Sequence, residues 1–128
     1  MELNVNCVRA ILLEMEKRPF GEALTFEQLE EKLPRFSEEE LRYSCFKLCE
    51  AGYINATHFK PWGETIPLFC ELRDITSQGH EFLDNIRNDT VFGKLLKVTG
   101  DIGSGSLEIV AQVASALFTD FLHGKLGM

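Results

Sequence analysis

The most constraining feature of this chain is a change in the spacing of its apolar residues between Ser37 and Ile86. Apolar residues recur there first every three or four positions, then every second position, and then every three or four again. A period of 3.6 residues is typical of a helix, and a period of two is typical of a strand with one buried face. The segment is therefore expected to fold as a helix, a two-stranded hairpin and a second helix.

Local hydrogen-bonding residues set the ends of the first helix in this segment. Ser37 and Glu40 have the spacing of a capping box, in which each side chain bonds the backbone amide of the other residue. Gly52 can adopt the left-handed conformation that follows many helices. A helix is therefore expected from Ser37 towards Ala51.

The hairpin is predicted from the alternation that follows. Within residues 65–72, one face carries four apolar side chains: Ile66, Leu68, Cys70 and Leu72. Phe69 belongs to the opposite face and is expected to point outward. Residues 53–60 are expected to form the partner strand, joined through the turn residues Pro-Trp-Gly-Glu at 61–64.

Helices are also expected on both sides of the hairpin segment. Asn4 can cap a first helix that stops before Pro19, and Thr25 with Gln28 forms a capping box for a short second helix. The helix after the hairpin is expected to carry three apolar residues on its inner face: Phe82, Leu83 and Ile86.

The expected order of elements is helix, helix, helix, strand, strand, helix, which is the order of a winged helix. The predicted α+β fold is a winged-helix domain over residues 1–88, with the hairpin as its wing, and a C-terminal helical extension over 89–128. The extension should contain a short helix through Val98 and a glycine-rich linker over 99–106. The serine that ends this linker is expected to cap a long last helix starting at Leu107.

The helix after the hairpin contains the most distinctive string in the chain. Residues 76–87 read Thr-Ser-Gln-Gly-His-Glu-Phe-Leu-Asp-Asn-Ile-Arg, with Thr76 or Ser77 as the expected cap. This string resembles the hallmark of a family of uncharacterised bacterial and bacteriophage proteins, and parts of residues 3–12 and 37–54 also match that family. The resemblance covers most of the chain and implies a winged-helix-like fold. It implies no activity and no site residues.

The charge of the chain makes nucleic acid a disfavoured partner. The chain carries 13 basic and 20 acidic residues, a net charge of −7, and residues 37–50 alone have a net charge of −2. The helix that would enter a DNA groove begins with three consecutive glutamates, which phosphates would repel. If the protein does bind DNA, the candidate contacts are Arg42, Lys47, Lys60 and Arg73.

Aromatic residues of the hairpin indicate a protein partner instead. Trp62 lies in the predicted turn, Phe69 is expected to point outward, and Phe59 can lie near it across the hairpin. Exposed aromatic side chains are typical of protein interfaces. The alternative is that these rings pack on the C-terminal helices of the same chain.

The last helix, from Leu107 to about His123, is apolar around most of its circumference. Its polar residues form one narrow stripe: Glu108, Gln112, Ser115 and Thr119. Such a helix must be buried on more than one side, which a small winged helix alone does not provide. A homodimer is therefore expected, and its interface should include Val113, Leu117, Phe118 and Phe121. The alternative is a deep slot within one chain.

No catalytic, cofactor or metal site is predicted. Cys45 and Cys49 share a helical face, but a zinc site needs two more ligands and the three histidines lack ligand spacing. The acidic residues near His80 are explained as the outer side of a helix. No signal peptide or membrane-spanning stretch is visible, so a cytoplasmic protein is expected, without membrane association or a small-molecule substrate.

Three functions are consistent with these patterns. The leading hypothesis is a non-enzymatic, regulatory protein-interaction module. The first alternative is a winged-helix transcriptional regulator that binds DNA. The second alternative is an acidic phage-type inhibitor that imitates nucleic acid towards a basic host protein. The three differ in the surface they require, which is an uncharged aromatic patch, a basic stripe or a continuous acidic face, respectively.

Overall fold

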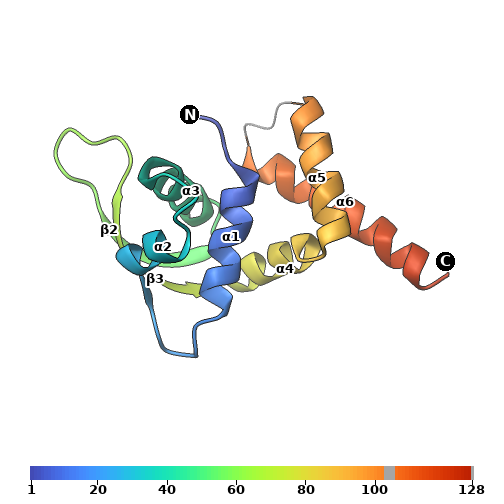
Figure 1. Cartoon of the computed structure of the whole chain (residues 1–128), viewed down its shortest axis with the longest axis horizontal. Coiled ribbons are helices and arrows are strands. Elements are labelled where there is room, and N and C mark those ends of the chain that lie inside the picture. The colour runs from blue at the N-terminus through green and yellow to red at the C-terminus, as the bar shows by residue number, and fades with distance from the viewer. Residues whose placement is uncertain (103–105, 128) are drawn as a thin grey trace.

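The computed structural model of the chain describes residues 1–102 and 106–127. Within them, six α-helices and a small antiparallel sheet form a mixed α+β fold (Figure 1). The helices are α1 (Val5–Glu16), α2 (Phe26–Lys32), α3 (Glu38–Glu50), α4 (Ser77–Ile86), α5 (Asp89–Ile102) and α6 (Leu107–Lys125). The strands are β1 (Leu24–Thr25), β2 (Ile54–Phe59) and β3 (Leu68–Ile75).

Side-chain caps set the starts of five helices, as the sequence indicates. The capping side chains, each of which accepts a hydrogen bond from a backbone amide of the first turn, are Asn4, Thr25, Ser37, Thr76 and Ser106. Both predicted capping boxes are complete. Gly52 follows α3 with a φ of 77°, in the predicted left-handed conformation. Each cap stabilises its helix by about 1 kcal/mol, because it satisfies an amide that has no partner inside the helix.

The strands form one antiparallel sheet in the order β1-β3-β2, so β3 lies in the centre. Strand β1 pairs Leu24 with Leu72 and is too short to give a periodic signal in the sequence. Strand β2 lies within the predicted partner strand. Strand β3 begins at Leu68, later than the alternation predicts, and continues to Ile75. The late start follows Pro67, which has no amide hydrogen to donate to a neighbouring strand.

Two irregularities in the pairing of β3 reverse the predicted faces of Phe69 and Cys70, whereas Leu72 is buried as predicted. The partners along β2 skip Cys70 and Arg73, so each of these is an extra residue in β3. An extra residue shifts the alternation of side chains by one position. The buried side chains of β3 are consequently three residues apart: Phe69, Leu72 and Ile75. The prediction that Cys70 points inward and Phe69 outward is wrong, because Cys70 is exposed and Phe69 is only 7% exposed.

Helix α4 packs directly on the start of β2. The amide of Thr76 donates to the carbonyl oxygen of Tyr53 at 3.0 Å, and its hydroxyl donates to the carbonyl oxygen of Gly52 at 2.6 Å. A Cβ atom on Gly79 would lie 2.0 Å from the same Tyr53 oxygen, so only glycine fits without a shift of the backbone. The distinctive string at 76–87 therefore has a structural role at this junction.

Arg9 joins α1 to the junction of α4 and α5. Its guanidinium donates to the carbonyl oxygens of Ile86 and Arg87, at 3.0 and 2.6 Å. It also donates to the Asp89 carboxylate at 2.8 Å and lies 4.3 Å from the centroid of the Phe92 ring. Carbonyl groups at the C-terminal end of a helix have no amide partner within the helix. Here the Arg9 guanidinium provides the missing hydrogen-bond donors. No local pattern in the sequence indicates this contact.

The C-terminal helices share the core of the rest of the chain. The main cluster of buried residues includes five of theirs: Phe92, Leu95, Leu107, Val110 and Ala114. Helix α6 packs on both α4 and α5, and its C-terminal end extends beyond the rest of the molecule (Figure 1). Helix α5 continues to Ile102, so residues 99–102 are helical instead of forming the predicted linker. Residues 103–105 of that linker lie outside the described residues.

Candidate functional site

Two of the three predicted partner-binding aromatics lie at the surface. The loop between β2 and β3 projects from the body of the molecule (Figure 1), and Trp62 in this loop is fully exposed. Phe59, the last residue of β2, is 54% exposed. Phe69 is buried, with its ring 5.3 Å from the ring of His58. We call Phe59 and Trp62 together the hairpin tip, which is an exposed aromatic surface.

The two predicted DNA contacts on α3 are held by acidic neighbours. Arg42 lies 3.7 Å from a carboxylate oxygen of Glu38 and 3.8 Å from one of Glu64, and its side chain is 18% exposed. The ammonium group of Lys47 lies 3.1 Å from the Glu50 carboxylate. Both positive charges therefore have acidic partners within the chain.

The other two predicted DNA contacts, Lys60 and Arg73, are exposed on the hairpin. The first turn of α3, where DNA recognition would begin, is acidic. In that turn, the Glu40 carboxylate accepts a hydrogen bond from the side-chain amide of Asn4 at 2.7 Å and one from the backbone amide of Ser37 at 3.2 Å. These bonds, the first above all, hold the pKa of Glu40 below its ordinary value. The Glu40 carboxylate therefore stabilises the N-terminal end of α3.

The four predicted dimer residues of α6 divide into two pairs, and all four are half-buried. Val113 and Leu117 pack against the core of their own chain. Phe118 and Phe121 stack on each other, with ring centroids 6.4 Å apart. Both lie in the C-terminal half of α6, and Phe121 lines a surface pocket together with Lys94 of α5.

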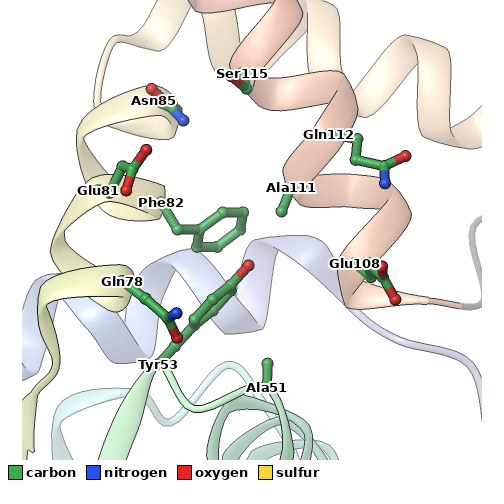
Figure 2. A pocket seen from close by; sticks show the side chains of 10 residues that line it. All are labelled: Ala51, Tyr53, Gln78, Glu81, Phe82, Asn85, Glu108, Ala111, Gln112 and Ser115. Atoms are coloured by element: carbon green, nitrogen blue, oxygen red, sulfur yellow. The ribbon is translucent and has the colours of Figure 1, made fainter.

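The structure also contains a groove that the sequence does not predict. It has a volume of about 410 Å³ and lies between α4 and α6 (Figure 2). Tyr53 and Phe82 lie between the two helices, with their ring centroids 5.1 Å apart. The Tyr53 hydroxyl points into the space below Ala111. We call this feature the α4–α6 groove.

Two rows of polar side chains form the walls of the α4–α6 groove (Figure 2). The row on α4 consists of Gln78, Glu81 and Asn85, and the row on α6 consists of Glu108, Gln112 and Ser115. The spacing of three and four residues in each row keeps its members on one face of the helix. Within the described part of the chain, none of these six side chains takes part in a hydrogen bond or an ion pair.

The α4–α6 groove has a negative electrostatic character. The ten residues that line it include two carboxylates, Glu81 and Glu108, and no lysine, arginine or histidine. Burial raises the pKa of the Tyr53 hydroxyl, and the negative charges of Glu108 and then Glu81 raise it further. Both carboxylates thus act on the same space, which is suited to a positively charged group.

The sequence indicates only one of the two polar rows of this groove. The α6 row is part of the polar stripe that interrupts an otherwise apolar helix, although Thr119, the last residue of that stripe, does not line the groove. The α4 row looks like an ordinary outer face of an amphipathic helix. Because the two rows come from helices distant in the sequence, only the packing of α6 on α4 brings them together.

The cysteines lie in different environments. Cys7 and Cys45 are buried and Cys49 is half-buried, whereas Cys70 is exposed. Burial raises the pKa of the Cys7 and Cys49 thiols to about 11, so both are neutral near pH 7 and pack as small apolar groups. In residues 1–102 and 106–127, no group of three or more histidine, cysteine, aspartate or glutamate residues is arranged to hold a metal ion. Over the same residues, no helix is long and apolar enough to cross a membrane.

Comparison with known proteins identifies relatives. A family model described as "Hypothetical protein (DUF2513)" matches residues 2–106. An "Uncharacterized protein" of Haemophilus influenzae is 34% identical over 126 residues, which cover 95% of this chain and 99% of the relative. Only 5% of this chain lies outside the alignment, whereas α6 alone has 19 residues. The similarity therefore includes most of this helix. No solved structure matches the chain.

Proposed function

This chain belongs to the DUF2513 family, and we propose that it acts without catalysis, as a regulatory module that binds another protein through the hairpin tip. The observation that carries the proposal is the exposure of the tip. Trp62 is fully exposed and Phe59 is more than half exposed, at the end of a hairpin that projects from the body. Large aromatic side chains in this position are what protein partners bury.

We also infer that residues 1–88 form a winged helix. The order α1, β1, α2, α3, β2, β3, with β1 paired to β3 of the hairpin, is the order of that fold. The β2–β3 hairpin is then the wing, and α3 is the helix that would enter DNA in a DNA-binding member. In this chain the wing carries the aromatic surface, which favours an interaction there over one on α3.

Affinity capture with matched variants tests this proposal. The tagged full chain, Trp62→Ser and Phe20→Ser are each used to capture proteins from nuclease-treated bacterial lysate. Phe20 is a suitable control because it is as fully exposed as Trp62 and lies in the loop between α1 and β1. We expect a protein that is retained by the wild type and by Phe20→Ser and is lost with Trp62→Ser. Equal loss in both variants, or equal retention in both, contradicts a role for the hairpin tip.

DNA binding is an alternative with weaker support. The exposure of Lys60 and Arg73 favours it, whereas the pairing of Arg42 and Lys47 with glutamates opposes it. We expect no binding to random duplex DNA at physiological salt, where non-specific dissociation constants are typically about 10⁻⁴ to 10⁻⁶ M. Salt-sensitive micromolar binding that is lost in Lys60→Ala/Arg73→Ala would favour DNA instead. Imitation of nucleic acid, the other alternative, is supported by the net charge of −7.

A cytoplasmic location in a bacterial or phage context is part of the same proposal. The four cysteines are free thiols, which is usual for proteins kept in a reducing compartment. The Haemophilus influenzae relative comes from a bacterium. Fractionation of cells that express the tagged chain, with a periplasmic marker as a reference, tests the location.

A further inference from the structure

We propose that the α4–α6 groove binds the side chain of an arginine in a peptide segment of a partner. This site is separate from the hairpin tip and does not depend on its function. The proposal rests on three properties of the groove, which are its charge, its aromatic floor and its open shape.

The charge of the groove favours a cation. Glu81 projects from α4 and Glu108 from α6, on opposite sides of the same space (Figure 2). Neither carboxylate takes part in an ion pair with another described residue, in contrast to Glu16, Glu38 and Glu50, which do. A positive group placed in the groove would be attracted by the negative charge on both of its walls. Arginine suits this position because its planar guanidinium can donate hydrogen bonds to two acceptors at once and is more weakly hydrated than an ammonium group.

The floor of the groove supplies an aromatic surface. Tyr53 is half-buried and stacks on Phe82, which fixes the position of its ring. Arginine packs well on aromatic rings, both through its charge and through its aliphatic stem. A carboxylate pair without such a floor would not distinguish arginine from a hydrated metal ion. The combination in this groove therefore favours an organic cation.

The shape of the groove favours a peptide over a free small molecule. Five of its wall residues are exposed to solvent along the edges of the groove: Gln78, Glu81, Glu108, Gln112 and Ser115. Pockets for small molecules usually enclose most of their ligand, whereas this groove encloses one side of an occupant. Its side-chain amides can donate and accept hydrogen bonds, as the backbone of a bound peptide requires.

Nuclear magnetic resonance of the ¹⁵N-labelled full chain tests this assignment directly. Gln78, Asn85 and Gln112 have side-chain NH₂ groups in the groove, and each pair of NH₂ signals reports on an occupant. We expect the end-blocked peptide Gly-Ser-Arg-Ser-Gly to shift these signals and to leave those of α2 unchanged. The same peptide with citrulline, which keeps the shape of arginine and removes its charge, should bind about tenfold more weakly.

Charge-removing variants identify the responsible carboxylates. We expect Glu81→Gln and Glu108→Gln each to weaken binding of the arginine peptide by up to about fivefold, because each retains the size of the side chain and loses its charge. Glu31→Gln is the matched control, since Glu31 is exposed on α2 and the substitution changes the net charge by the same amount. Binding to the wild type should also weaken as salt is added, a result that does not depend on any variant folding.

Several outcomes would overturn the proposal. Equal affinity for the arginine and citrulline peptides would show that charge is not recognised. An equal loss of affinity in Glu31→Gln would show that only the overall charge of the protein matters. If acetyl-arginine methylamide binds as tightly as the peptide, the groove is a site for a small cation and not for a peptide segment. Signals that shift elsewhere, with the three NH₂ pairs unchanged, would place the binding at another surface.

Discussion

Gly79 lies where α4 meets the backbone of Tyr53, and its missing side chain is what allows the two to touch. A Cβ atom at this position would also come within 2.7 Å of the Ile75 side chain. We expect Gly79→Ala to lower the free energy of unfolding by about 3 kcal/mol, at the upper end of the range for overpacked sites. Urea denaturation followed by circular dichroism measures this change.

Gly93 provides the matched control for that substitution. It lies in α5 and is exposed, and a methyl group added there would meet no neighbouring atom within 4 Å. Gly93→Ala should therefore raise the free energy of unfolding by about 0.5–1 kcal/mol, because alanine favours a helix over glycine. A similar change in both variants would mean that the close approach at Gly79 is absent in solution.

Among the elements, β3 shows most clearly how pairing can overrule a sequence pattern. Its two extra residues place Phe69 in the core and Cys70 at the surface. We expect Phe69→Ala to lower the free energy of unfolding by about 3–5 kcal/mol, as for other buried aromatic residues. Cys70→Ala should change it by less than about 0.5 kcal/mol. Denaturation of both variants decides the register, since uninterrupted alternation requires the reverse order of effects.

Helices α1 and α4 are joined at their C-terminal ends by an ion pair between Glu16 and Arg87. The Arg87 guanidinium donates to both carboxylate oxygens of Glu16, one of them at 2.7 Å, and this bond lowers the pKa of Glu16. A lowered pKa in the folded state stabilises the protein above the pKa of the unfolded state, and this contribution is lost as the pH falls. Glu16→Gln should therefore lower the free energy of unfolding by about 0.2–1 kcal/mol at pH 7, as for other exposed pairs. The difference should vanish at a pH where Glu16 of the wild type is protonated in both the folded and the unfolded state.

Denaturation of the wild type and Glu16→Gln between about pH 2.5 and pH 7, a range that spans the ordinary titration of a glutamate, measures this dependence. Glu31→Gln, which removes an exposed glutamate of α2, should show no such convergence at low pH. A difference between wild type and Glu16→Gln that persists at the lowest pH would indicate lost packing instead of a lost ion pair.

At the scale of the whole molecule, α6 has two different halves. Its first half is buried against α4 and α5 through Val110 and Ala114, whereas its second half extends beyond them (Figure 1). Leu122 is 40% exposed and Phe118 and Phe121 are only half-buried. The homodimer predicted from the sequence therefore remains our proposal. We assign Phe118 and Phe121 to the contact with the second subunit, and Val113 and Leu117 to the core of their own chain.

The oligomeric state can be tested with two neighbouring substitutions. Light scattering of the intact protein at micromolar concentration should give the mass of a dimer. Phe118→Asp should give a monomer, because a carboxylate buried at an interface without a partner costs several kcal/mol. Thr119→Asp introduces the same charge on the exposed polar stripe and should leave the dimer intact. A monomer mass for the wild type, independent of concentration, would show that no dimer forms.

The local sequence determined where helices start and where most of them end. Ser37 bonds Glu40 within one turn, and Thr25 bonds Gln28 in the same way, so each cap depends only on residues close together in the chain. The same locality makes the position of Trp62 in a turn predictable, because a proline and a glycine lie on either side of it. These features need no knowledge of the rest of the fold.

Tertiary structure alone decided the face of Phe69, the requirement for glycine at 79 and the α4–α6 groove. Each of these depends on the distance between segments that are far apart in the sequence. The extra residues in β3 appear only when β2 is paired with it, and the row of Glu81 meets the row of Glu108 only when α6 packs on α4. A side-chain period reports which face of an element is apolar, but it does not report what that face will touch.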